Sequence, residues 1–326
     1  MYPNNHLFVQ EAGQVVLLII DPQNDFHDDP TVSPDDPTSK KGSLAVTGST
    51  EQAKRVAQFI RDNTHRIGEI FITLDSHHKR HIAHKAFWSS IENDLAHKGK
   101  SPVDFQQISN QDLLDDKWFP KDTSLQEYVL KYTRRLERVG GAGAIKGEGG
   151  DDKDDKRFKL TIWPDHCLIG SGGHAIQDDI QKAVREWDVA HPKKYVKHIH
   201  KGMNCLTEMY SAIKAEVPIV SDSTTTKNEE LLDELRKSGR LLICGQALSH
   251  CVRFTATDIL HDWEEYAMLN CEPADFAKIY ILEDASASVY GYDESGAEFL
   301  QMMRNKGCTV TKLANALDDW CPAIKM

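Results

Sequence analysis

Short apolar runs alternate with helical patterns along this chain of 326 residues. Strands are expected at residues 15–20, 70–74, 195–199, 241–244, 279–282 and 308–313. Continuous apolar strands separated by helices are typical of a parallel sheet that helices cover on both faces. The pattern therefore predicts an α/β protein, with a three-layer α/β/α fold around a six-stranded parallel sheet.

Residues 49–64 carry the clearest helical pattern. The apolar positions that recur at helical spacing are Ala53, Val56, Ala57 and Ile60. Ser49 followed by Gln52 suits a capping box at the start of this helix. A second helical pattern begins near His250, soon after the strand at 241–244.

Polar residues and glycine follow several of the predicted strands. Asp21, Asp75, Lys201 and Gly245 each stand just after one of them. Active sites of parallel sheets lie at the carboxyl ends of the strands. We therefore expect these residues to meet at one edge of the sheet.

We expect residues 1–326 to form a single domain with a large insertion at about 85–158. The insertion would lie over the strand ends as a lid or as an oligomer contact. Residues 140–156 are rich in glycine and then densely charged. Such a composition buries too little apolar surface to offset the cost of ordering, so we expect this stretch to be mobile.

Composition narrows the functional classes. A net charge of -11 argues against a surface built to bind nucleic acid or an anionic membrane. We see neither an apolar run of membrane-spanning length nor a secretory signal, which favours a cytoplasmic protein. The seven cysteines are odd in number and widely spaced, which, with no secretory signal seen, argues against a disulfide framework. They include no CxxC pair, which argues against a structural cysteine-zinc site.

Cys251 is the candidate nucleophile. It follows a predicted strand and opens a predicted helix, where the positive end of the helix dipole is expected to lower the thiol pKa. On position alone, a buried structural cysteine is the commoner interpretation.

Six segments in a fixed order make Cys251 a stronger candidate. Together they resemble the nicotinamidase/isochorismatase-like superfamily of cysteine hydrolases, and in particular a longer nicotinamidase-related branch. The segments are LIIDPQNDF at 18–26, TLDSHHKRHI at 73–82, IWPDHCL at 162–168, KG at 201–202, CGQALSHCV at 244–252 and LEDA at 282–285.

The resemblance implies a catalytic triad of Asp21, Lys201 and Cys251. A carboxylate can take the thiol proton and return it to the leaving ammonia. A nearby ammonium favours the thiolate and the ionised carboxylate. The resemblance also assigns the oxyanion hole to the backbone N–H groups of Ala247 and Cys251, with a cis peptide bond between Gln246 and Ala247.

A metal site is implied by the same resemblance, with Asp75, His77 and His166 as ligands. The Asp-x-His spacing places two ligands on one face of an extended chain. His81 is a candidate fourth ligand or an outer partner. Carboxylate and imidazole donors suit one divalent ion, for which zinc is preferred and iron or manganese are alternatives.

The implied reaction is hydrolysis of a small carboxamide through a thioester, with nicotinamide converted to nicotinate and ammonia in NAD salvage. Phe26 and Trp163 match positions that sandwich the pyridine ring, and a homo-oligomer is expected. Ala83 and His84 replace the usual Ser-Phe, which leaves the substrate open. The alternatives are another C–N hydrolase acting on ureido or carbamoyl compounds, an isochorismatase-like vinyl-ether hydrolase, and a catalytically silent binding protein.

Overall fold

A computed structural model describes residues 14–29, 31, 41–90, 100–137, 159–318 and 320. The stretch 140–156, for which we predicted mobility, lies outside these residues. None of the described helices is both long and apolar enough to cross a membrane.

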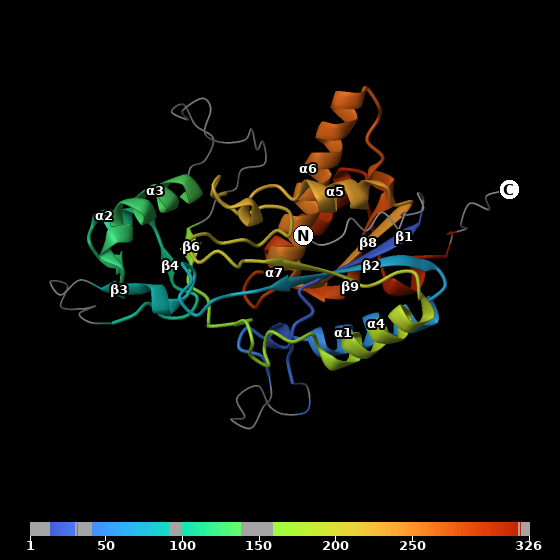
Figure 1. Ribbon diagram of the computed structural model, residues 1–326, viewed down its shortest axis with the longest axis horizontal. Coiled ribbons are helices and arrows are strands. Elements are labelled where there is room, and N and C mark those ends of the chain that lie inside the picture. The colour runs from blue at the N-terminus through green and yellow to red at the C-terminus, as the bar shows by residue number, and fades with distance from the viewer. Residues whose placement is uncertain are drawn as a thin grey trace.

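The centre of the protein is a six-stranded parallel sheet in the order β10-β9-β8-β1-β2-β7 (Figure 1). Its strands are β1 (Val15–Ile20), β2 (Ile67–Asp75), β7 (Lys197–Lys201), β8 (Arg240–Gln246), β9 (Ile279–Ala287) and β10 (Thr309–Thr311). All six predicted strands are confirmed, although β7 begins and ends two residues later than expected. Lys201 is therefore the last residue of β7, whereas the sequence placed it after the strand.

Strand β1 shows why the sheet is covered on both faces. Val16, Leu18 and Ile20 belong to one apolar core, while the alternate residues Val15, Leu17 and Ile19 belong to the other. All six side chains are almost completely buried. Because successive side chains in a strand point to opposite faces, an unbroken apolar run requires apolar partners on both sides.

Helices supply those partners. One face packs against α1 (Ser49–Asp62) and α4 (Asp178–Ala190), and the other against α5 (Glu229–Arg236), α6 (Arg253–Asn270) and α7 (Asp293–Asn305). Figure 1 shows α1 and α4 side by side below the sheet, with α5 and α6 above it. The predicted three-layer fold is confirmed. A π-helical turn spans Leu248–Val252, and 3₁₀ turns span Asn24–Phe26, Lys85–Phe87, Thr123–Leu125, Ser223–Thr225, Phe276–Lys278 and Leu313–Asn315.

A smaller group of elements lies apart from the main sheet, beyond the ends to which the β2 and β9 arrows point (Figure 1). It contains α2 (Asn110–Leu114), α3 (Gln126–Glu137) and two antiparallel pairs. The pairs join β3 (Trp88–Ser90) to β5 (Trp118–Pro120), and β4 (Gln107–Ile108) to β6 (Leu160–Thr161). We refer to residues 85–90, 100–137 and 160–161 as the outer group.

Two tyrosines of α3 join the outer group to the main body. The Tyr128 hydroxyl donates to the carbonyl of Leu206 at 2.7 Å, and the Tyr132 hydroxyl accepts from the amide of Glu208 at 3.0 Å. Residues 206–208 follow β7 and therefore lie next to the strand ends. The outer group supports this segment by direct hydrogen bonds.

The start of α1 differs from the predicted capping box. Gly48 is the residue before the helix, and the Asp28 carboxylate accepts from the amides of Gly48 at 2.6 Å and Thr50 at 3.0 Å. Ser49 donates to the same carboxylate, while Gln52 accepts from the side chain of Gln246. The box was wrong because a distant carboxylate already satisfies the first N–H groups of the helix.

We predict that Asp28→Ala lowers the free energy of unfolding by about 1–2 kcal/mol, the usual effect of losing such a cap. Burial alone would raise the pKa of Asp28, but its bonds from Thr50 and Gly48 hold the pKa below its ordinary value. The stabilisation is thus complete above the unfolded pKa of about 3.9 and is lost as the pH falls through the lower folded pKa. Urea unfolding of both proteins at pH 7 and at pH 3 would measure it.

The matched control is Asp62→Ala at the opposite end of α1. A carboxylate there faces the negative end of the helix dipole, so its removal should leave stability unchanged or slightly raised. Equal destabilisation by both substitutions would contradict the capping role of Asp28.

Candidate active site

Four neighbouring strands, β8, β1, β2 and β7, deliver the predicted site residues to one place. Asp21 directly follows β1, while Asp75 and Lys201 are the last residues of β2 and β7 and pair with each other in register. Cys251 lies in the π-helical turn after β8, the other neighbour of β1. The carboxyl edge of the sheet therefore brings together Asp21, Asp75 and Lys201, as the strand pattern predicted, and places Cys251 beside them.

The Lys201 ammonium lies at the centre of this group. Its Nζ is 3.0 Å from Asp21 Oδ2 and 3.0 Å from Asp75 Oδ1. The same atom is 3.5 Å from Cys251 Sγ and donates to the Met209 carbonyl at 3.2 Å. Burial alone would lower the pKa of Lys201, but Asp21, Asp75 and Cys251 together raise it well above its ordinary value. The lysine is therefore a fixed positive charge.

Asp21 is completely buried and is held by Thr73 on the neighbouring strand. The Thr73 hydroxyl donates to Asp21 Oδ1 at 2.5 Å and accepts from the Asp21 amide at 3.0 Å. Burial raises the pKa of Asp21, although Lys201 opposes this shift. A carboxylate with a raised pKa is a better proton acceptor than an ordinary aspartate.

The Cys251 thiol is neutral at rest, contrary to our prediction of a lowered pKa. Burial raises its pKa well above the ordinary value; Lys201 opposes this shift, and the carboxylates of Asp21 and Asp75 add to it. The helix dipole was the wrong guide because burial, which disfavours the charged thiolate, is the largest cause of the shift. Attack by this sulfur therefore requires transfer of its proton, and the Asp21 carboxylate is one of the groups that act electrostatically on the thiol.

The chain turns sharply between β8 and Cys251. Gly245 has a φ of +118°, and a Cβ there would lie 2.0 Å from the carbonyl oxygen of Ile20, so β8 approaches β1 too closely for any side chain. The peptide bond between Gln246 and Ala247 is cis, which confirms that prediction. The Ala247 carbonyl accepts from the amides of His250 and Val252. The oxyanion hole at Ala247 and Cys251 stays a prediction.

A second cluster lies against the first. Oδ2 of Asp75 is 3.1 Å from His77 Nε2 and 3.2 Å from His166 Nε2. All three side chains are buried, and their ligand atoms lie within 4.8 Å of one another. Burial alone would raise the pKa of Asp75, but His77, Lys201 and His166 hold it well below its usual range. Two imidazole nitrogens facing one buried carboxylate oxygen form a donor set that fits a divalent cation.

Gln23 and Gly202 fix the geometry of this cluster. The Gln23 side chain donates to the Asp75 carbonyl and accepts from the Asp75 amide, both at 2.7 Å. Gly202 has a φ of +73°, and a Cβ there would lie 2.8 Å from the His77 ring and 2.9 Å from Asp75 Oδ1. Glycine after Lys201 is therefore required by the close packing of the two ligands.

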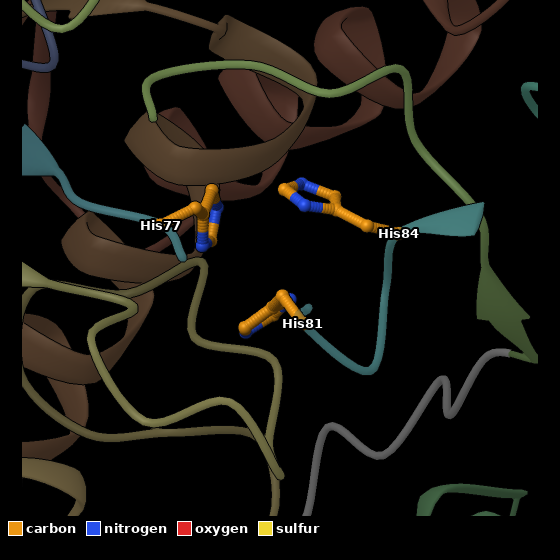
Figure 2. A group of neighbouring side chains, drawn as sticks. All are labelled: His77, His81 and His84. Carbon is orange, nitrogen blue, oxygen red and sulfur yellow. The ribbon is translucent and has the colours of Figure 1, made fainter. Parts of the chain in front are cut away.

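The ring nitrogens of His81 are engaged by the backbone. Its Nε2 lies 3.1 Å from the Thr207 carbonyl, and its Nδ1 accepts from the Ala83 amide at 3.2 Å. A third buried group of donors nevertheless combines His77 and His81 with His84. Figure 2 shows the three rings around a common space, with His77 and His84 on opposite sides of it.

The two predicted ring-binding residues contact different histidines. Phe26 is buried, with its ring centroid 5.6 Å from that of His166. Trp163 donates its indole N–H to the Tyr210 hydroxyl at 3.1 Å and packs edge-on against His250. Both are buried aromatics next to the clusters, and their contact with a substrate stays a prediction.

Sequence reasoning missed four residues of the site. Thr73 and Gln23 hold Asp21 and Asp75, and Glu208 is a buried carboxylate whose raised pKa results from burial, opposed by His77. His84 was noted only as a departure from the family pattern. A signal existed for Gln23 in the PQNDF segment and for Thr73 two residues before Asp75, but none indicated Glu208.

Comparisons with known proteins show which proteins this chain is similar to. No model of a known protein family matches the chain. The nicotinamidase of Saccharomyces cerevisiae is 26% identical over 240 residues, which cover 74% of this chain and 78% of the yeast protein. The nicotinamidase of Escherichia coli is 28% identical over 140 residues, which cover 40% of this chain and 58% of that protein, less than two thirds of its length.

Solved structures share the fold. A nicotinamidase/pyrazinamidase of Acinetobacter baumanii superposes with a TM-score of 0.54 at 17% identity, over 94% of this chain and 99% of that one. The yeast nicotinamidase bound to the inhibitor nicotinaldehyde superposes with a TM-score of 0.54 at 19% identity, over 92% of this chain and all of that one (100%). At these identities the likeness concerns the fold.

We predict that Lys201→Met lowers the free energy of unfolding by about 3–5 kcal/mol, because two buried carboxylates lose their shared cation. Adding Asp21→Asn should recover part of this loss, since it removes one of the unpaired charges. Chemical denaturation followed by circular dichroism would give all three values.

Lys182→Met serves as the control, because Lys182 is exposed on α4 and its loss should change stability by less than about 0.5 kcal/mol. If Lys201→Met lowered the free energy of unfolding no more than Lys182→Met does, Lys201 would not be the cation that stabilises the two carboxylates.

Proposed function

We propose that this chain, which belongs to the nicotinamidase/isochorismatase-like superfamily, is a cysteine amidohydrolase that acts on a small carboxamide. One observation carries the proposal: the Lys201 ammonium contacts Asp21, Asp75 and the Cys251 sulfur together. A neutral thiol, a carboxylate with a raised pKa and a fixed cation form the set that acyl transfer requires.

In the first half of the reaction, Asp21 takes the proton of the Cys251 thiol as the sulfur attacks the carboxamide carbon. The new C–S bond places negative charge on the carbonyl oxygen. Backbone N–H groups of Ala247 and Cys251 are proposed to stabilise that charge. Collapse of this intermediate breaks the C–N bond, and Asp21 gives its proton to the nitrogen, which leaves as ammonia.

The second half hydrolyses the resulting thioester. Asp21 takes a proton from water, whose oxygen attacks the thioester carbon, and the C–S bond breaks. The sulfur recovers its proton from Asp21, and the carboxylic acid is released. Throughout both halves, Lys201 stays charged and offsets the negative charge that moves between Cys251 and Asp21.

We assign one divalent ion to Asp75, His77 and His166, with zinc preferred and iron or manganese as alternatives. When bound, the ion supplies Lewis-acid binding of a ring nitrogen or of a water molecule. Gln23 and Gly202 support this assignment, because one holds the backbone of Asp75 and the other allows the ligands to pack closely.

Nicotinamide is the proposed substrate, with nicotinate and ammonia as products. The two nicotinamidase relatives support this choice, and so do the buried aromatics Phe26 and Trp163, which suit a flat ring. A role in NAD salvage, a cytoplasmic location and homo-oligomerisation are further parts of the proposal. We also propose that the outer group covers the strand ends as part of an insertion at about 85–158.

We predict that Cys251→Ala abolishes ammonia release, with a fall in kcat of at least about 10⁴-fold, the scale seen when a catalytic triad loses a member. The assay is ammonia release across a panel that includes nicotinamide, other small amides, ureido and carbamoyl compounds. Circular dichroism should show an unchanged fold.

Cys271→Asn is the matched control, because Cys271 is exposed and adopts a left-handed backbone that asparagine tolerates. Full activity of Cys251→Ala would exclude the thiol mechanism. An active wild-type protein that spares nicotinamide but cleaves another member of the panel would redirect the substrate assignment.

The metal assignment predicts about one divalent ion per chain, lost in the double variant His77→Ala, His166→Ala. In this variant the KM for nicotinamide should rise by a larger factor than the factor by which iodoacetamide labelling of Cys251 slows. The reason is that the metal ligands hold the substrate and not the thiol. Elemental analysis of protein purified without chelators gives the stoichiometry. A metal-free wild-type protein would count against the assignment and favour isochorismatase-like chemistry.

A further inference from the structure

His84 is a buried polar side chain with no partner of its own. Its side chain is completely buried, and neither ring nitrogen makes a hydrogen bond within the described part of the chain. The backbone of Lys79 is close enough to favour the charged ring slightly, yet outside hydrogen-bonding geometry. Leaving a buried donor or acceptor unsatisfied is costly, so two such nitrogens on one ring require an explanation.

The ring of His84 lies against the donor set assigned to the cation. Its centroid is 5.0 Å from that of His77 and 5.3 Å from that of His166. The charges of His77, His166 and Asp75 all act on it. Figure 2 shows the His84 ring reaching toward His77 from the segment that leads into β3. The unsatisfied ring therefore lies next to two of the three assigned ligands, and it faces His77.

His81 has the opposite character. Because Nδ1 accepts from the Ala83 amide, Nε2 carries the proton and donates to the Thr207 carbonyl. Both nitrogens are thus satisfied by the backbone. Binding a cation through His81 would break one of these buried hydrogen bonds, whereas binding through His84 would break none.

We propose that His84 is the fourth protein ligand of the cation held by Asp75, His77 and His166, and that His81 is a structural support for the loop between them. This inference rests on the metal assignment made under the proposed function. The donor atoms of His77 and His84 lie within 4.8 Å of each other. Two nitrogens on a tetrahedral zinc ion are about 3.4 Å apart, so the His84 ring would have to move toward the other ligands to share one ion with them.

Four protein ligands would leave the ion fewer open coordination positions for a substrate. A tetrahedral ion would have no open position, so binding of a ring nitrogen or water requires a coordination number of five or six. Zinc reaches five, and iron or manganese favour six. His84 thereby favours an ion with expanded coordination.

The test replaces the native metal with Co²⁺ and compares the wild type with His84→Phe, His84→Ala and His81→Asn. X-ray absorption should count three imidazoles in the wild type and in His81→Asn, but two in both His84 variants. The Kd for Co²⁺ should rise at least about 100-fold in the His84 variants, above the 10–100-fold typical of losing an outer partner. Added imidazole should restore much of the affinity of His84→Ala but leave His84→Phe unchanged.

Circular dichroism and iodoacetamide labelling of Cys251 check that each variant is folded. An unchanged imidazole count in the His84 variants, or two Co²⁺ ions per wild-type chain, would overturn the proposal. Loss of one imidazole in His81→Asn instead would assign the ligand to His81. A wild type that binds no Co²⁺ would overturn both this inference and the metal assignment, whereas amide hydrolysis tests the thiol mechanism separately.

Discussion

A single buried ammonium group holds two carboxylates and a thiol together at the edge of the sheet. Lys201 is almost completely buried, and a charge in such a place persists only when opposite charges surround it. Asp21 and Asp75 supply those charges from β1 and β2. The register of β2 with β7 places Asp75 beside Lys201, and so the order of three strands is tied to one electrostatic requirement.

Asp75 joins the two clusters because its two oxygens have different partners. One oxygen faces Lys201 and through it the thiol, while the other faces the imidazoles of His77 and His166. A cation bound to the second oxygen would draw negative charge away from Lys201 and strengthen the hold of Lys201 on Asp21 and Cys251. Asp75 thus links the nucleophile to the metal donors electrostatically. This link requires the two groups to lie at neighbouring strand ends.

The sequence predicted features that follow from local periodicity. Buried strands require unbroken apolar runs, so the six strands and the polar residues at their ends could be located in advance. The cap of α1 could not, because Asp28 lies twenty and twenty-two residues before the two N–H groups that it binds. The raised pKa of Cys251 depends on burial, which arises only after packing. His84 stands three residues from His81, and spacing alone cannot tell which ring the backbone has already satisfied.

The two hydrogen bonds of Tyr128 and Tyr132 connect the outer group to residues 206–208, beside the carbonyl that accepts from His81. Substitutions in α3 therefore differ in their effect on the site, depending on whether they remove one of these two hydroxyls. Exposed positions of α3 are free to diverge among descendants of this chain. The two tyrosines are not, because losing either hydroxyl would release a segment that lies against the reactive centre. Selection on catalysis would act at a distance on a helix that contains no reacting group.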